Sequence, residues 1–448
     1  MSSNKKGIIE RPRTTCAHGG ALATLGSLPG VVAISHAAEG CAGNLTNAIS
    51  ACSGNNGEGY CGGMQTPTSA VREKNVIFGG TKRLQKELET AQAIIDAQLF
   101  VVVTGCMTEI IGDDIQGVID EFVDAPTPVI AVNTPSFEGD AYVGYELIMD
   151  GIFNRFLRPA KTRQENLVNL FGIIPNFDPF YRGDLEEIKR ILERLGLKVN
   201  TFFTPDQTFE NIIQASSASL NINLSRTWGS NFLKKFEDTH KTPFWETELP
   251  IGAEATERFI RELTEHITVD QERVEKVIQE EKKRYYDYFI RTLDLMVNSQ
   301  FFYYTGIVAN SNYAIPLALF LKMEMGWQVD DIFITDLLDK KKKELLLKRW
   351  NNELPGGELL FETDTKQIAW QLSKRHPRNH GERYFDQHTP FYLVGSALEK
   401  YAAADIGALT LAVSYPVYNR VIATKGYAGF QGGLNLLEDL ISVPVSGR

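Results

Sequence analysis

Blocks of apolar residues alternate along the chain with amphipathic blocks, and this pattern predicts strands and helices in turn. Residues 99–104 (LFVVVT) and 128–134 (PVIAVNT) are short apolar runs of the kind found in buried strands. Residues 81–97 (TKRLQKELETAQAIIDA) instead carry apolar side chains at helical spacing, with charged residues between them. Strands that alternate with helices in this way predict a parallel sheet with right-handed crossovers.

The same alternation recurs twice further along the chain. Residues 168–174 (VNLFGII) and 199–203 (VNTFF) predict strands on either side of a helix that Gly196 ends, and residues 329–335 (VDDIFIT) and 391–396 (FYLVGS) predict strands of a third unit. The chain has 448 residues, whereas a domain has about 150. We therefore predict an α/β protein of three Rossmann-like domains with parallel sheets, over residues 1–163, 164–297 and 298–448, the last with a C-terminal helix.

The balance of charges restricts the partners of the chain. Its 56 acidic and 46 strongly basic residues give a formal net charge of −10, which offers no attraction for nucleic acid or for an anionic membrane. No run approaches the roughly 18 apolar residues of a membrane-spanning helix, and the N-terminus lacks the apolar segment of a signal peptide. We therefore expect a cytoplasmic protein, without nucleic acid or membrane partners, whose thiols stay reduced.

All five cysteines lie in the first quarter of the chain. Cys16, Cys41 and Cys106 stand at turns beside predicted strands, and Ser136 follows the strand at 128–134. Ligands of parallel sheets gather beyond the carboxyl ends of the strands, and thiolates suit iron and sulfide better than a hard cation. The spacing alone leaves buried structural cysteines as the alternative.

Several motifs for other chemistry are missing from the sequence. It contains no GxxxxGK[ST] phosphate loop, no HExxH zinc motif, no GxSxG nucleophile motif and no CxxC pair. Any ATP hydrolysis that the reaction needs must therefore come from a partner protein.

Longer motifs surround the candidate ligands, and others follow in the rest of the chain. The first group is TTC at 14–16, HAAEGC at 36–41, VIFGG at 76–80, TGCMTEIIGDDI at 104–115 and NTPSFEGDAYVGYE at 133–146. The second group is VNLFGIIPNFDPFYRGDLEEIKRILERLGL at 168–197, PIGAEATERFIREL at 250–263 and SYPVYNRVIATKGYAGFQGGLNLLEDLI at 414–441. Together they resemble the nitrogenase component 1 family, specifically its β-type subunit, over nearly the whole chain.

This resemblance implies a cofactor and two partners. It implies that Cys16, Cys41 and Cys106 ligate half of a P-cluster-type iron–sulfur cluster, [8Fe-7S], which is shared with an α-like subunit in an α2β2 heterotetramer. Ser136 matches a serine that joins the cluster on oxidation; the alternative is a hydroxyl that satisfies a turn after Pro135. Phe78 matches an aromatic residue that docks an iron–sulfur ATPase reductase component; the alternative is a core residue that ends a strand.

Other candidate residues receive plainer interpretations. Cys52 and Cys61 lie in a segment rich in Gly and Asn, where we expect free loop thiols and keep a ligand or regulatory pair as the alternative. His376, His380 and His388 surround Pro377 in a polar stretch, which predicts a solvated turn rather than a metal site. The run KKKKELLLKRW predicts a charged helix face, and Asp113 and Asp114 are expected at the start of a helix.

The cysteine distribution also bears on function. No cysteine follows Cys106, so the second and third domains offer no thiolate to a catalytic cofactor, and we expect the reducing site in the partner. The resemblance implies an electron-relay subunit of a nitrogenase-like two-component reductase. The chain is short beside the molybdenum nitrogenase β subunit, so methylthio-alkanes, reduced at a C–S bond, are the expected substrates. The alternatives are dinitrogen reduction, a cofactor-assembly scaffold or a tetrapyrrole reductase subunit.

Overall fold

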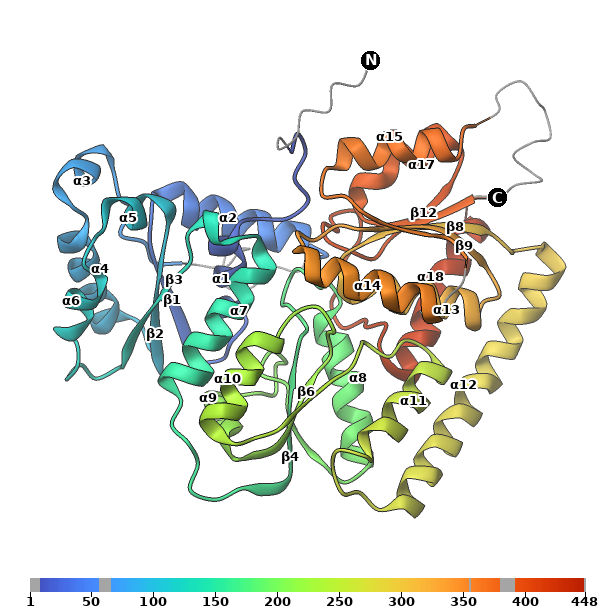
Figure 1. Ribbon diagram of the computed structural model, residues 1–448, viewed down its shortest axis with the longest axis horizontal. Coiled ribbons are helices and arrows are strands. Elements are labelled where there is room, and N and C mark those ends of the chain that lie inside the picture. Colours follow the sequence, from blue (N-terminus) through green and yellow to red (C-terminus); the bar gives the residue numbers. More distant parts are fainter. Residues whose placement is uncertain (1–8, 56–65, 354–355, 379–390, 447–448) are drawn as a thin grey trace.

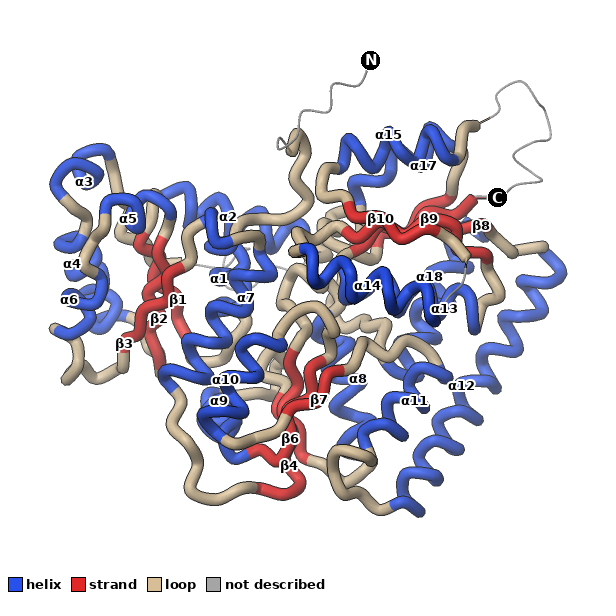
Figure 2. Tube along the Cα trace, in the orientation of Figure 1, coloured by secondary structure: helices blue, strands red, loops and turns tan. Residues whose placement is uncertain are grey.

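Three parallel sheets form the framework of the chain. The computed structural model describes residues 9–55, 66–353, 356–378 and 391–446. Within these residues the strands form a three-stranded, a four-stranded and a five-stranded sheet, each with helices beside it (Figure 2). All pairings between the named strands are parallel, which confirms the predicted α/β class.

The first sheet, at the left of Figure 1, has the order β1-β2-β3. Its strands alternate their side chains between two apolar layers, one against α1 and α7 and one against α4 and α6. Leu84 and Leu88 of α4 are fully buried in the second layer, as the helical spacing of residues 81–97 predicted. The elements are α1 (Ala17–Gly26), β1 (Val31–His36), α2 (Glu39–Cys52), α3 (Glu73–Phe78), α4 (Thr81–Ile94), β2 (Leu99–Thr104), α5 (Cys106–Ile111), α6 (Ile115–Asp120), β3 (Val129–Asn133), the 3-10 turn η1 (Ser136–Glu138), α7 (Ala141–Met149) and the π-helical turn η2 (Asp150–Phe156).

The second sheet has the order β5-β4-β6-β7. Helix α8 follows β4, and Gly196, with φ +97°, ends the helical run before β5, as its position in the sequence predicted. The elements are β4 (Gln164–Phe171), α8 (Tyr181–Arg194), β5 (Lys198–Asn200), α9 (Phe209–Gln214), η3 (Ala215–Ser217), β6 (Ala218–Asn223), α10 (Ser230–His240), β7 (Phe244–Glu246), α11 (Ala253–Leu263) and the long α12 (Gln271–Ser299).

The third sheet has the order β10-β9-β8-β11-β12. Numbered within the unit this is 3-2-1-4-5, the strand order of Rossmann folds. The elements are β8 (Tyr304–Ala309), α13 (Ser311–Met323), β9 (Gln328–Ile334), α14 (Lys340–Glu353), β10 (Glu358–Phe361), α15 (Thr365–Arg375), β11 (Phe391–Gly395), η4 (Ala397–Glu399), α17 (Lys400–Ile406), β12 (Leu409–Ala412) and α18 (Gly429–Ser446). Each sheet draws its strands from one of the three predicted ranges; the domain bounds themselves stay a prediction.

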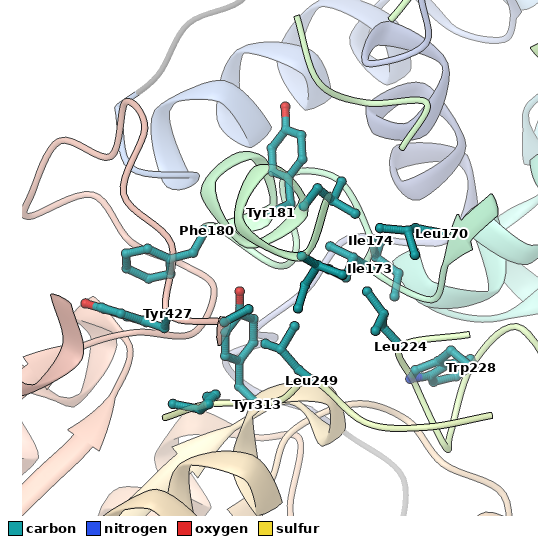
Figure 3. Close-up of a cluster of buried hydrophobic side chains, with 14 of the residues drawn as sticks. Leu170, Ile173, Ile174, Phe180, Tyr181, Leu224, Trp228, Leu249, Tyr313 and Tyr427 are labelled. Carbon is teal, nitrogen blue, oxygen red and sulfur yellow. The ribbon is translucent and has the colours of Figure 1, made fainter. Parts of the chain in front are cut away.

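One apolar core runs through all three units. Figure 3 shows part of it, where Leu170 of β4, Leu224 after β6, Tyr313 of α13 and Tyr427 converge. The closing helix α18 packs against α8, α11 and α12 of the second unit. After the third sheet the chain therefore returns to the second unit, and α18 joins the two units.

Two local predictions for the first unit were wrong. The alternative interpretation that Phe78 ends a strand is wrong, since residues 76–78 belong to helix α3. The segment HAAEGC was expected to be a turn, but α2 begins at Glu39 and continues to Cys52. Both helices are short or rich in small residues, so their apolar periodicity is too weak to distinguish them from strand or loop.

Among the described residues, no helix is both long and apolar enough to cross a membrane. The cytoplasmic location stays a prediction.

Helices α1 and α7 cross at backbone contact, which two glycines permit. A Cβ atom on Gly144 would lie 2.0 Å from the carbonyl oxygen of Ala17, and one on Gly20 would lie 2.0 Å from that of Ala141. We predict that Gly144→Ala lowers the free energy of unfolding by at least about 2 kcal/mol, because the helices must separate.

The matched control for this prediction is Gly43→Ala in α2, where an added Cβ meets nothing within 4 Å. It is expected to stabilise the chain slightly, by about 0.5–1 kcal/mol, because Ala favours the helix. Urea unfolding of both variants measures the difference, and equal stabilities of Gly144→Ala and wild type would contradict the packing argument.

Asp178 generates a prediction about pH. Burial raises the pKa of this carboxyl to about 7, against hydrogen bonds from Ile174 N–H and the Asn312 and Asn310 amides. The unfolded chain releases this proton near pH 4 and the folded chain near pH 7. The folded state therefore binds more protons between these values, and the free energy of unfolding falls as pH rises from about 4 to about 7.

We expect Asp178→Asn to make this decline shallower by up to about 1.4 kcal/mol per pH unit. Urea unfolding of both proteins between pH 5 and 8 measures the two slopes. Burial also raises the pKa values of Asp184 and Asp140, to about 6. The free energy of unfolding of the variant should therefore still fall as pH rises, but less steeply. Identical slopes would show that Asp178 titrates normally.

Candidate functional site

Strand register gathers the candidate residues at one edge of the first sheet. His36 at the end of β1 pairs with Thr104 at the end of β2, and Thr104 pairs with Asn133 at the end of β3. Cys41, Cys106 and Ser136 each follow the end of one of these strands by a few residues. The prediction that ligands lie beyond the carboxyl ends of these strands is therefore consistent with their positions in the fold.

Cys106 and Ser136 are in direct contact. The thiol lies 2.8 Å from Ser136 Oγ, and the N–H of Ser136 donates to Sγ across 3.1 Å. Cys106 opens helix α5 with Gly105 as the preceding cap, and a Cβ on Gly105 would lie 2.6 Å from the Ala37 Cβ. A glycine is therefore required there, since only it lets the turn approach the end of β1.

Cys16 reaches the same edge by a different route. It was expected at a turn beside a strand, but it is the residue that precedes helix α1 and forms a β-bridge with Asp140. The N–H of Ala17 donates to the carbonyl of Gly139 across 2.9 Å. The crossing of α1 and α7 thus places Cys16 beside the segment that begins at Ser136.

Cys41 lies in the first turn of α2, where its N–H donates to the Ala38 carbonyl across 2.9 Å. Burial raises the pKa of its thiol, and the charges of Cys16 and Cys106 raise it further. The three thiols therefore lie within electrostatic reach of one another, and all three are half-buried. Thiolates gathered in this way repel, and a bound cation relieves that repulsion.

The candidate ligands are soft donors. Among the residues that the structure describes, no group of three or more His, Cys, Asp or Glu side chains is arranged to hold a single metal ion. Three half-buried thiols with one adjacent hydroxyl are donors of the kind that suits iron–sulfur chemistry.

His18 is a residue that the sequence analysis missed. Its Nδ1 lies 3.2 Å from the Thr104 carbonyl and 3.1 Å from Thr134 Oγ1, and its Nε2 lies 3.0 Å from Ser35 Oγ. Burial lowers the pKa of this imidazole to about 4, so it stays neutral. Its ring therefore connects helix α1, which follows Cys16, with the ends of the three strands. Its position two residues after Cys16 was the available signal.

Phe78 lies on the surface rather than in the core. Its side chain is 85% exposed at the end of α3, next to Ile77 at 76%. Helix α5, which α3 contacts, exposes Ile110 to the same extent of 76%. We call these three side chains the apolar patch; its location excludes the alternative of a core residue at position 78.

The remaining candidates do not join this site. Cys52 ends α2, packs against the main core and hydrogen-bonds Tyr415, so it is not the loop thiol that was predicted. Cys61, His380 and His388 lie outside the described residues.

His376 is not simply solvated, since its Nε2 lies 2.7 Å from Asp331 Oδ2 and its ring packs on Phe391. Asp114 caps α6 as predicted, and the lysine run forms α14.

The strand ends of the other two sheets are filled by the chain's own side chains. Asp178, after β4, accepts amide hydrogen bonds from Asn310 and Asn312, after β8, at 2.7 and 2.9 Å. Asp336, after β9, accepts from the Trp228 indole, after β6, at 2.8 Å. All five side chains are buried, so hydrogen bonds at these strand ends join the second and third units.

Comparison with known proteins gives consistent matches. The family described as nitrogenase component 1 type oxidoreductase matches residues 16–443. The chain is 22% identical to the nitrogenase molybdenum-iron protein beta chain of Sinorhizobium fredii, over 98% of this chain and 84% of that protein. It is 29% identical to the nitrogenase iron-molybdenum cofactor biosynthesis protein NifE of Nostoc, over 59% of this chain and 54% of that protein.

A solved structure shares the fold. The structure titled "Nitrogenase Cp1 at pH 6.5" superposes with a TM-score of 0.79 at 19% identity, covering 100% of this chain and 95% of that one. With a family match over nearly its whole length and this fold, the chain belongs to the nitrogenase component 1 type oxidoreductases.

Proposed function

We propose that this chain is the β-type, electron-relay subunit of a nitrogenase-like two-component reductase. Cys16, Cys41 and Cys106 hold one half of a P-cluster-type [8Fe-7S] cluster, with Ser136 beside it, and an α-like subunit holds the other half in an α2β2 heterotetramer. The observation that carries this proposal is the arrangement of three half-buried, electrostatically coupled thiols at one sheet edge. The family match supports an oxidoreductase role for the complex.

The geometry supports a shared site. Each thiol starts a helix or lies in the first turn of one. The Ser136 N–H already donates to Cys106 Sγ. An iron–sulfur cluster held there supplies one-electron transfer; the chain supplies ligands, hydrogen bonds to sulfur and a half-open face that a partner subunit closes.

The rest of the chain supports a reducing site in the partner. No cysteine follows Cys106, and the strand ends of the second and third sheets are occupied by the Asp178 and Asp336 hydrogen bonds. The cluster ligands of this chain therefore pass electrons onward, and the α-like subunit binds the substrate. We propose methylthio-alkanes as substrates, with dinitrogen or a tetrapyrrole as the alternatives.

A cofactor-assembly scaffold is the second candidate function. The similarity to NifE supports it as well as the similarity to beta chains supports the relay. The two are distinguished by the fate of the metal: a relay keeps its cluster through many reaction cycles, whereas a scaffold hands metal on to an acceptor protein. Anaerobic incubation of the complex with the reductase component, ATP, a reductant and methyl thioethers, dinitrogen or acetylene, followed by product and iron analysis, separates them. Iron lost to an acceptor without product would contradict the relay.

The ligand assignment predicts a specific loss of metal. In the anaerobically purified complex with the α-like subunit, we expect Cys106→Ala to lose at least about half of the cluster iron, because a thiolate ligand is removed. Cys52→Ala is the matched control, since Cys52 lies on the same helix as Cys41 but contacts Tyr415 instead. Iron and sulfide analysis with electron paramagnetic resonance makes the measurement. Equal iron in Cys106→Ala and wild type would refute the assignment.

The exposed patch predicts a docking defect. We expect Phe78→Ser to weaken binding of the ATP-hydrolysing reductase component by about 10-fold or more, because a large exposed aromatic side chain is a typical interface anchor. Val123→Ser is the control, since Val123 is 81% exposed on the same unit but lies outside the apolar patch. Binding with non-hydrolysable nucleotide is measured by interferometry. Similar losses in both variants would mean that Phe78 has no special role.

A further inference from the structure

His36 lies between the apolar patch and two of the candidate ligands. It is the last residue of β1 and stands five positions before Cys41. Its side chain is fully buried. This side chain is not among the proposed cluster ligands, although it makes hydrogen bonds from both ring nitrogens.

The imidazole makes two hydrogen bonds in opposite directions. Nε2 lies 3.0 Å from Asp113 Oδ2, and Nδ1 lies 2.8 Å from Ser69 Oγ. A carboxylate accepts only, so Nε2 carries the hydrogen and donates it to Asp113, while the Ser69 hydroxyl donates to Nδ1. The ring orientation is thereby fixed from both sides.

The backbone of His36 holds the start of helix α5, where Cys106 lies. Its carbonyl accepts from the Gly105 N–H at 3.0 Å and from Thr108 Oγ1 at 2.9 Å. Asp113, which the ring contacts, follows the end of the same helix, and its N–H donates to the Thr108 carbonyl across 3.2 Å. One residue therefore contacts both ends of α5.

Asp113 extends this connection to the apolar patch. Its Oδ1 accepts the N–H of Gly80 at 2.8 Å, two residues after Phe78. A Cβ on Gly80 would lie 2.6 Å from Asp113 Oδ2 and 3.0 Å from His36 Cε1. The turn after α3 thus rests directly on the buried pair, without space for even a methyl group.

We propose that His36 is a positioning residue that couples the turn beside Phe78 to helix α5, so that a protein bound at the apolar patch shifts the Cys106 thiol. The identity of that bound protein, the reductase component, rests on the proposed function. The coupling between the turn and helix α5 does not depend on the proposed function. Packed interiors transmit displacement because they have few voids. Here Asp113 bonds both Gly80 of the turn and Thr108 of α5, and His36 bonds Asp113 and the start of α5.

Amide hydrogen exchange in the full chain tests the coupling without any cluster. Gly80→Ala pushes on Asp113 and His36 from the surface side. We expect it to speed exchange at the Gly105, Glu109, Gly112 and Asp113 amides by about 10-fold, because their acceptors move. Gly43→Ala, whose Cβ meets nothing within 4 Å, is the control and should change these rates by less than about twofold. Unchanged rates in Gly80→Ala would overturn the proposal.

A second pair of variants separates positioning from general stability. His36→Leu removes the donor to Asp113, whereas the amide of His36→Gln restores one at nearly the same place. We expect the slow exchange at Gly112 and Asp113 to be lost in His36→Leu and restored in His36→Gln. Equal exchange in the two variants overturns the proposal. Should His36→Leu fail to fold, the Gly80→Ala comparison still decides.

The final measurement uses the assembled complex. If reductase binding shifts the midpoint potential of the cluster in wild type, His36→Gln should keep that shift and His36→Leu should lose most of it, with equal iron in both. A wild-type complex that binds the reductase without any shift overturns the coupling at the ligand. A wild-type complex without a cluster contradicts the proposed function instead, and the exchange experiment then decides the coupling alone.

Discussion

The backbone contact between α1 and α7 is the constraint on which the candidate site depends. Gly20 and Gly144 allow each helix to approach the other's carbonyl oxygens, where any larger side chain would collide. The helices cross near their starts, at Cys16 and at Asp140, and the strand β3 leads into α7 through Ser136. A thiol from the beginning of the chain is thereby fixed beside residues more than a hundred positions later.

The other half of the arrangement comes from strand register. In a parallel sheet, residues that follow paired positions emerge at the same edge. The pairings His36 with Thr104 and Thr104 with Asn133 therefore determine where Cys41, Cys106 and Ser136 lie. His18 joins these two constraints, since its ring on α1 contacts the ends of all three strand segments through Ser35, Thr104 and Thr134. The crossing of α1 and α7 and the register of the strands thus place the candidate residues at the same edge of the sheet.

Sequence patterns predicted the parts of this fold whose signals are local. Strand β2 is a continuous apolar run and α4 has strict helical spacing, and both were predicted closely. Helices α2 and α3 were missed, because Gly and Ala give α2 little apolar contrast and α3 has only six residues. The exposure of Phe78 was not predictable from periodicity, since an apolar residue at a helix end has no pattern of its own. The contact of Cys16 with Asp140 depends on the α1–α7 crossing, which no local signal encodes.

The electrostatics of the three thiols indicate why such a site belongs at an interface. Burial and the neighbouring thiols of Cys16 and Cys106 both raise the pKa of Cys41, so the charged, metal-binding form of this thiol is disfavoured in the free chain. Complete burial would raise this cost further, whereas full exposure would leave a cluster open to water and oxidants. In the proposed complex, half-burial by this chain, with the remaining cover from a partner, would reconcile the two requirements. Assembly would then create the environment in which the thiolates are stable, and cluster retention would depend on the complex rather than on either chain.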